Sequence, residues 1–332
     1  MEKIALCENN DLKNLLIFLK LNWKNENTKF KNIKFFKWLY FNKNSKKYNF
    51  VLFKKKNIIR GCLGFFINDN SIKKVVWLSL WLVDQNYRKN VSGLSLLNFL
   101  KKKYKNSIII TSGINKKTTP IYKILRFKIA KLNQFYLINP KKKILNLVKV
   151  NKQKKYNFKK NDFQIIIKNK INFLENNKIF QRKEKIYLKD IKYFKKKYQF
   201  NPIFKYKFYI IKNTKKIFGF FIGRVCTFNK SKALRLVEFY GCENKISYLG
   251  NQFIDIMLKN NYEFIDFYNY GINKNYLEEA GFQINKMKSD TIIPNYFSPF
   301  VKKNIDIDVV FWPNNTKIKV FKGDGDQDRP NF

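Results

Sequence analysis

The sequence predicts a mixed α/β (α+β) protein with two tandem units, each a mixed, mostly antiparallel sheet flanked by helices. Three observations predict this class. Strand-like apolar runs come in groups of three, and a helical pattern follows each group. The order of these elements recurs in the second half of the chain, and two short sequence matches accompany it. With 332 residues, 45% of them hydrophobic, the chain is long enough for two packed cores.

The first half begins with helices and continues with strands. Asp11 is a candidate N-cap for a helix that starts at Leu12, and a second amphipathic helix is expected near 30–41. Three strands follow, then a helix, a strand, a short helix and a further strand. The expected ranges are, in that order, 48–53, 61–67, 75–83, 92–104, 107–111, a helix after Thr119 and a strand from Phe127.

The second half repeats this order after a Lys- and Asn-rich connection with some strand content. Strands are expected from Lys205, Lys216 and Lys232, followed by a helix near 245–258, the strand YEFIDFY and a helix after Lys274. Gly64-Phe65-Phe66 matches Gly219-Phe220-Phe221, and Gly113-Ile114-Asn115-Lys116 matches Gly271-Ile272-Asn273-Lys274. We therefore expect two copies of one unit. The expected divisions are 1–150, a connection over 151–186, 187–322, and a tail over 323–332.

The net charge of +46 would ordinarily suggest a nucleic acid or an anionic surface as partner. Nearly all of this charge comes from lysine, however, and Lys, Asn, Ile, Phe and Tyr share AT-rich codons. A strongly AT-rich genome explains that pattern without a ligand. We therefore expect solvated lysine faces and no specific nucleic-acid partner.

Several kinds of site are excluded by residue type. The chain contains no histidine, which excludes Ser–His–Asp and Cys–His catalysis and His-ligated metals, so no metal site is expected. The four cysteines form no CxxC pair and lie in or beside apolar segments, which favours free thiols in a reducing compartment. The N-terminus does not resemble a signal peptide, and no apolar run is long enough to span a membrane. A cytoplasmic protein is expected.

The stretch WLSLWLVDQNYRKNVSGLSLL, at 77–97, passes from a strand through a cationic turn into a helix. Such a turn presents unpaired backbone N–H groups and the positive end of the helix dipole. A phosphate is the common ligand of this arrangement. A strand, a turn and a helix with a solvated basic turn is the alternative.

This stretch and the later segment GINKKTTPIYKILRF resemble the GNAT superfamily of acyl-CoA-dependent acyltransferases. The residues that match the family's turn pattern are Val83, Tyr87, Arg88, Gly93, Leu96 and Leu97. Gln85, Lys89 and Val91 replace the usual proline and two of the three glycines. Asn115, Tyr122 and Phe127 match the later part of the pattern, with Arg126 in place of a glycine. The second copy has Ala280-Gly281-Phe282 there, but no recognisable phosphate turn between Tyr240 and Tyr248.

The resemblance implies acyl-CoA, most simply acetyl-CoA, as co-substrate. The residues it implies for binding are Leu82, Val83, Arg88, Lys89, Asn90, Val91, Ser92, Gly93 and Asn115. It also implies that Tyr122 is the acid that serves the leaving thiolate. Glu238 and Asp266 are candidate bases because carboxylates are unusual within strands. The alternatives are a packed helix tyrosine for Tyr122 and salt bridges to lysine for the two carboxylates.

The resulting hypothesis is an acyltransferase that moves an acyl group, most simply acetyl, from CoA to an amine. A small-molecule amine is the expected acceptor, and an amino sugar of surface-glycan biosynthesis, including a sugar nucleotide, is the candidate by analogy alone. Two alternatives stay open. One is a Fem-type aminoacyl transferase that uses aminoacyl-tRNA, and the other is a catalytically degenerate binding module.

The tail VFKGDGDQDRPNF alternates Asp with other residues at Asp324, Asp326 and Asp328. This spacing resembles the start of a calcium loop, but Gly is absent at the sixth position and no closing Glu follows. Calcium is therefore rejected. A disordered end is the expectation. A tail that folds back over the active cleft, with Arg329 engaging an acidic group, is the alternative.

Overall fold

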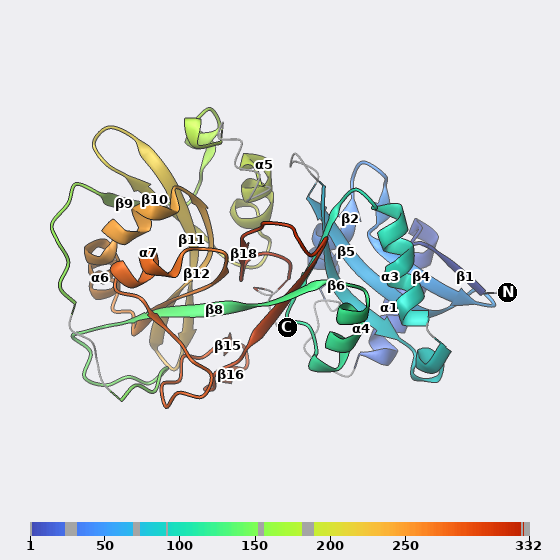
Figure 1. Cartoon of the computed structure of the whole chain (residues 1–332). Helices are drawn as coiled ribbons and strands as arrows, with labels where there is room; N and C mark the ends of the chain where they lie inside the picture. The colour runs from blue at the N-terminus through green and yellow to red at the C-terminus, as the bar shows by residue number, and fades with distance from the viewer. Residues whose placement is uncertain are drawn as a thin grey trace. The chain divides into compact units, whose positions relative to one another are not determined.

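The computed structural model describes residues 2–23, 32–68, 74–90, 92–151, 156–180, 189–326 and 328. They divide into two compact units (Figure 1). The first unit comprises the described residues of 1–129 together with 309–316, and the second those of 130–308 together with 317–328. The boundary therefore lies at Ile129 rather than at 150, and each unit includes a segment from the other half of the chain.

The sheet of the first unit has the strand order β1-β4-β5-β6-β7-β17. The strands are β1 (Glu2–Leu6), β4 (Phe50–Lys55), β5 (Ile58–Asn68), β6 (Val75–Val83), β7 (Ile108–Ser112) and β17 (Ile307–Trp312). All neighbours are antiparallel except β6 and β7, which are parallel. This arrangement confirms the predicted mixed, mostly antiparallel sheet.

Helices cover both faces of this sheet. They are α1 (Leu12–Asn22), α2 (Ile33–Tyr40), α3 (Ser92–Lys103) and α4 (Thr119–Ile124). Because successive strand residues point to opposite faces, Leu52 packs in the cluster of α1 and α2, and its neighbour Val51 packs in the cluster of α3. Asp11 precedes α1 as expected, but its carboxylate accepts from Glu8 N at 3.0 Å rather than capping that helix.

The sheet of the second unit has the order β8-β13-β12-β11-β10-β9. Its strands are β8 (Lys128–Ile138), β9 (Gln164–Lys168), β10 (Lys207–Lys212), β11 (Ile217–Phe228), β12 (Ser231–Gly241) and β13 (Phe264–Tyr270), with β14 (Gln283–Ile284) on β8 and β18 (Val320–Phe321) on β13. Only β12 and β13 are parallel. The helices are α5 (Ile191–Phe194), α6 (Gly250–Lys259) and α7 (Lys274–Glu279). Two short ribbons, β2 (Phe41–Asn42) with β3 (Lys47–Tyr48) and β15 (Tyr296–Phe297) with β16 (Phe300–Val301), complete the strands described.

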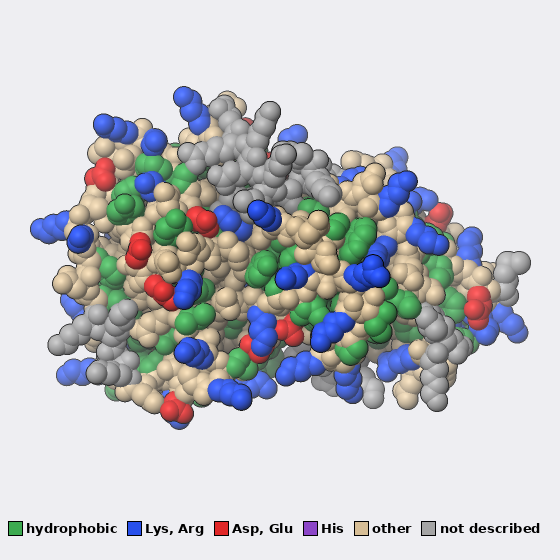
Figure 2. Space-filling model, viewed as in Figure 1, with side chains coloured by type: hydrophobic (Ala, Val, Ile, Leu, Met, Phe, Trp, Pro, Cys, Tyr) green, Lys and Arg blue, Asp and Glu red, His purple; other side chains and the backbone are tan. Residues whose placement is uncertain are grey.

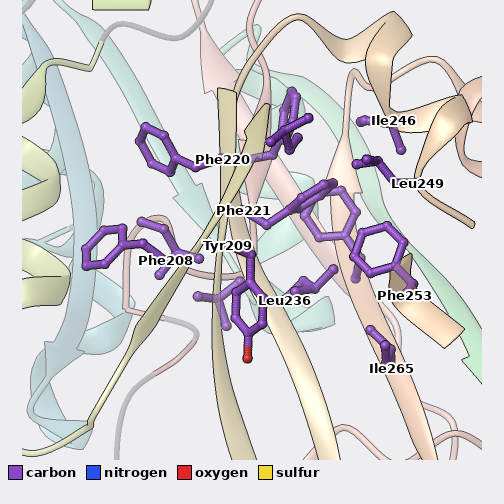
Figure 3. Packing of buried hydrophobic residues seen from close by; sticks show 14 of the residues in the cluster. Phe208, Tyr209, Phe220, Phe221, Leu236, Ile246, Leu249, Phe253 and Ile265 are labelled. Carbon is purple, nitrogen blue, oxygen red and sulfur yellow. The ribbon is translucent and has the colours of Figure 1, made fainter. Parts of the chain in front are cut away.

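Aromatic side chains form the core on both faces of the second sheet (Figure 3). Phe220 and Phe221 are successive residues of β11 and point to opposite faces. Phe220 lies 5.1 Å from the ring of Phe194 of α5, and Phe221 lies 5.5 Å from the ring of Phe253 of α6. Edge-to-face pairs of this kind add to the hydrophobic stabilisation of the core.

The two units share one order of elements. In each, two antiparallel strands lead to a third strand, then a helix, then a strand parallel to the third, then a short helix. Gly113 and Gly271 both have positive φ, and Asn115 and Asn273 both cap the next helical turn, so the second sequence match joins equivalent positions. The first match does not join equivalent positions. The last residue of β6 that pairs with its parallel neighbour faces Phe66 of β5, and the corresponding residue of β12 faces Gly223 of β11. The sequence match would instead make Phe221 the equivalent of Phe66.

The expectation of a disordered tail is wrong for residues 323–326, which are buried in the second unit. The carboxylate of Asp324 is paired there with Lys189 at 2.7 Å, which offsets the cost of removing its charge from water. Gln327 and residues 329–332, including Arg329, lie outside the described residues.

Basic side chains are scattered over the face drawn in Figure 2 and do not gather into one patch there. The four cysteines are free; Cys7, Cys62 and Cys226 are buried, and Cys242 is half-buried. Among the described residues, no helix is long and apolar enough to cross a membrane. Nor does the described part of the chain hold a group of three or more Cys, Asp or Glu side chains that could bind a metal ion.

Candidate functional site

The site in the first unit begins where β6 separates from β7. The two strands pair only from Val75–Trp77 with Ile108–Ile110. Within the described residues, the rest of β6, Leu78–Val83, pairs with β5 and with no other strand. A β-bulge lies at this point, because Leu63 faces Trp81 and Phe65 faces Leu78. A bulge bends the strand and increases its twist, so the outer part of β6 offers an open backbone edge.

The turn after β6 is held by Asp84 and Arg88. Asp84 pairs with Arg60 at 3.1 Å and accepts from Asn86 N at 3.0 Å. Arg88 donates from Nε to the carbonyl of Val83 at 3.1 Å, which fixes the turn against the end of the strand. The aromatic ring of Tyr87 lies 5.2 Å from the guanidinium of Arg60. Val91 and the side chains of Lys89, Asn90 and Ser92, all predicted to bind the cofactor, lie outside the described residues.

Trp81 brings the start of α3 together with Tyr122. A Cβ on Gly93 would lie 3.4 Å from Trp81 Nε1, so the first turn of α3 packs directly on this indole. The Trp81 and Tyr122 rings meet edge to face at 5.9 Å. Trp81 was not among the predicted site residues, although it lies within the motif. Its position became informative only once the bulge placed it beside Gly93.

Tyr122 is buried, at 3% exposure, and burial raises the pKa of its phenol. Its ring packs on Phe127 at 5.2 Å. Among the residues that the structure describes, none forms a hydrogen bond with its hydroxyl. The hydroxyl oxygen is not among the fully buried unpaired polar atoms of the described residues, so a ligand can reach it and accept its hydrogen bond.

The remaining predicted binding residues have structural contacts. Val83 packs in the core beneath α3, and Leu82 packs against the core beneath α1 and α2. Asn115 accepts from Lys117 N at 2.9 Å and so caps the helical turn that leads into α4. Val83 and Leu82 thus anchor the outer part of β6 in the cores on its two faces, and Asn115 fixes the turn that leads into the helix carrying Tyr122.

Glu238 lies in the second unit and is fully buried. Its carboxylate accepts from Lys189 Nζ at 2.8 and 3.0 Å and from the Tyr198 hydroxyl at 3.1 Å. Burial, and then the nearby Asp324, raise its pKa to about 7. Lys189 also contacts Asp324 at 2.7 Å, and these two carboxylates outweigh the effect of burial and raise the pKa of Lys189.

Asp266 is also fully buried, and its carboxylate is engaged on several sides. Arg235 holds it at 2.8 and 3.0 Å, and Gln134 Nε2 donates to it at 3.0 Å. Arg235 donates further to the carbonyls of Pro294 and Asn295. Asp266 of β13 is thus hydrogen-bonded to the two neighbouring strands, β8 and β12, and Arg235 connects this group to the loop at Pro294 and Asn295. The alternative to a catalytic role was a salt bridge to lysine for each carboxylate. Glu238 forms one with Lys189, and Asp266 forms one with Arg235 instead of a lysine.

An open groove of about 560 Å³ lies elsewhere in the second unit. Apolar residues such as Val148 and Ile292 form part of its wall, and Lys143, Lys149 and Lys302 border it. None of the predicted site residues lines this groove.

Comparisons with known proteins agree on the fold. No protein-family model matches the chain, and no curated protein matches it in sequence. Among the solved structures that are similar to it, two have a TM-score of 0.58. A GCN5-related N-acetyltransferase from Anabaena variabilis ATCC 29413 is 11% identical over 94% of this chain and 72% of its own. A conserved protein of unknown function from Enterococcus faecalis V583, a probable N-acyltransferase, is 9% identical over 93% of this chain and 72% of its own. The chain therefore has the GNAT fold.

The residues of the first unit fit an acyl-CoA. The open edge of β6 offers backbone groups to an extended ligand that carries amides. The cationic turn and the N-terminus of the twelve-residue helix α3 suit a pyrophosphate. Trp81 and Tyr122 border the same region.

Proposed function

We propose that the chain is an acyltransferase that moves an acyl group, most simply acetyl, from CoA to an amine acceptor. The observation that supports this most is the conjunction in the first unit of an unpaired strand edge, a cationic turn and an unpartnered tyrosine hydroxyl. The GNAT fold supports the reaction class by analogy.

Acyl-CoA would be held by the open edge of β6 and by the turn that enters α3. Backbone groups of Leu82 and its neighbours would pair with the amides of the pantetheine arm. Arg88 and the first N–H groups of α3 would receive the pyrophosphate, with Lys89, Asn90, Val91, Ser92 and Gly93 as the other proposed contacts. Bound in this way, the coenzyme supplies an acyl group activated as a thioester.

Tyr122 is the proposed partner of the leaving thiolate. Its raised pKa keeps the phenol neutral at neutral pH, so the hydroxyl is a hydrogen-bond donor there. The same raised pKa disfavours complete proton transfer to a thiolate, whose reference pKa is about 8.5. Tyr122 would therefore stabilise the developing thiolate chiefly through a hydrogen bond.

The acceptor is proposed to be a small-molecule amine, with an amino sugar or sugar nucleotide as the first candidates to assay. We assign structural rather than catalytic roles to Glu238 and Asp266, because lysine, arginine, tyrosine and glutamine donors already occupy their oxygens. Deprotonation of the amine is then left to water or to the acceptor's own acid–base equilibrium.

Calorimetry with acetyl-CoA tests the proposal. The Arg88→Ala variant should bind more weakly by about 1–3 kcal/mol, the scale of a charge-assisted hydrogen bond. Lys20→Ala, which removes an exposed cation from α1, is the matched control and should bind as the wild type does. Absence of binding heat with every CoA ester would refute the proposal. If CoA binds, a panel of amines and amino sugars then identifies the acceptor by release of free CoA.

A further inference from the structure

The second unit has the same separation of parallel strands as the first, but a peptide fills it. β12 and β13 pair from Ala233–Leu236 with Phe264–Phe267, and Val237 then forms a β-bulge opposite β11. The occupant is the segment formed by residues 318–326 with Asp328, here called the closing segment. Its β18 pairs with β13, where Phe321 faces Asn269.

Backbone hydrogen bonds join the closing segment to both strands. Lys322 N donates to Tyr268 O of β13 at 3.2 Å, and Gly323 N donates to Val237 O of β12 at 2.7 Å. The segment thus uses backbone groups that the separation of β12 from β13 leaves open. This is the pairing by which an extended peptide adds to a sheet.

Glycine is required at two points of this fit. A Cβ on Gly323 would lie 2.7 Å from Val237 O and would also collide with the Tyr198 hydroxyl. A Cβ on Gly271, whose φ is +95°, would lie 2.8 Å from Ile318 O. Atoms of the closing segment therefore approach the unit more closely than side-chain-bearing residues would allow.

Buried charges hold the segment in place. Asp324 contacts Lys189 Nζ at 2.7 Å and accepts from the Tyr193 hydroxyl at 3.0 Å. Asp328 accepts from Arg224 at 2.8 and 3.0 Å and from the Tyr206 hydroxyl at 2.7 Å. Buried carboxylates with this many donors are well compensated for lost solvation.

The position that corresponds to the cationic turn is unsuited to a pyrophosphate. The turn before α6 carries Glu243, whose carboxylate pairs with Lys319 at 3.1 Å. Phe158 packs against Gly250, the first residue of α6, and against Gly281. Both the strand separation and the helix entrance of the second unit are therefore occupied by the chain itself.

We propose that the separation between β12 and β13 is a peptide-binding slot whose resident ligand is the chain's own closing segment, and that this segment excludes acyl-CoA from the second unit. The second part rests on the proposed function, and it gives one acyl-CoA per chain, bound in the first unit. The first part stands on the contacts of the closing segment alone.

Hydrogen exchange of the full chain tests the resident peptide without any ligand. Amides of the closing segment should exchange about 100-fold or more slowly than the same sequence does as a free peptide. In Gly323→Ala, where the added methyl group displaces the segment, this protection should fall at least about tenfold. Gly61→Ala is the control, since a Cβ there meets its neighbours at 3.4 Å or more. Its closing segment should stay protected.

Exchange of the wild-type segment at free-peptide rates would overturn the proposal, whether or not Gly323→Ala folds. Calorimetric titration of the wild type with acetyl-CoA tests the exclusion, with one molecule per chain as the expected result. Two molecules per chain would overturn it while supporting CoA binding. No CoA binding with a protected segment would refute the proposed function and leave the peptide slot supported.

Discussion

The pair formed by Arg224 and Asp328 gives a prediction whose size follows from the structure. Asp328 has a side chain only 2% exposed and accepts from both Nε and Nη2 of Arg224. Burial opposes its ionisation, but Arg224 outweighs burial and lowers the pKa from 3.8 to about 2. A shift of this size corresponds to about 2–3 kcal/mol of folding stability at neutral pH. Asp328→Asn should therefore lower the free energy of unfolding by about that amount.

The pH dependence of this loss follows from the sign of the shift. Because the folded pKa is lowered, the stabilisation is complete above the unfolded value of 3.8 and is lost as the pH falls towards 2. The difference between wild type and Asp328→Asn should therefore be constant from pH 5 to 8 and should shrink below pH 4. Arg224 itself stays charged over this whole range.

Urea unfolding followed by circular dichroism measures the difference. All five tryptophans, Trp23, Trp38, Trp77, Trp81 and Trp312, lie in the first unit or its segment of β17, so their emission follows that unit separately. Asp306→Asn is the control, because the side chains of its pair with Lys131 are 31% and 58% exposed to solvent, and such a surface pair is worth about 0–1 kcal/mol. Asp328→Asn with wild-type stability at pH 7, or with an equal loss at pH 7 and at pH 2, would refute the reasoning.

Two further substitutions test the buried network and the site. Lys189→Met leaves Glu238 and Asp324 buried without their shared cation, so the free energy of unfolding at pH 7 should fall by about 3–5 kcal/mol. Lys192→Met, on the exposed surface, is the control. An equal effect of both substitutions would contradict the role of Lys189 as the shared cation. Tyr122→Phe removes the hydrogen bond to the developing thiolate and should lower acyl transfer by about 10²–10³ with CoA affinity unchanged. Single-turnover kinetics and calorimetry measure the two quantities, and unchanged turnover would make Tyr122 a packing residue.

Local pattern predicted most elements of the fold but not which strands pair. The runs at Val75–Val83 and Phe264–Tyr270 are apolar and bounded by polar turns, and both are strands. The run from Lys128 is also a strand, yet it pairs with β13 of the second unit, while β17 pairs with β7 of the first. Periodicity determines which face of a strand is apolar, but the choice of partner depends on contacts that are distant in sequence.

The site was predictable only where the motif was local. Arg88, Gly93 and Tyr122 lie on the turn, helix start and short helix where the motif placed them. The closing segment was misjudged because its Gly and Asp composition is typical of exposed ends. In the structure Gly323 permits close backbone approach, and Asp324 and Asp328 pair with Lys189 and Arg224. Composition carries no information about such distant partners.

The same strand separation has opposite consequences in the two units. An unpaired strand edge inside a protein must find donors and acceptors, because buried backbone groups without partners cost free energy. In the second unit Gly323 and Lys322 meet that need with a peptide of the same chain. In the first unit the described residues supply no strand for Leu78–Val83, and the adjoining turn is cationic. If both units descend from one copy, the peptide in the second unit and the amide-bearing coenzyme that we propose for the first would satisfy the same backbone requirement. This would account for the loss of the phosphate turn only where the peptide is present.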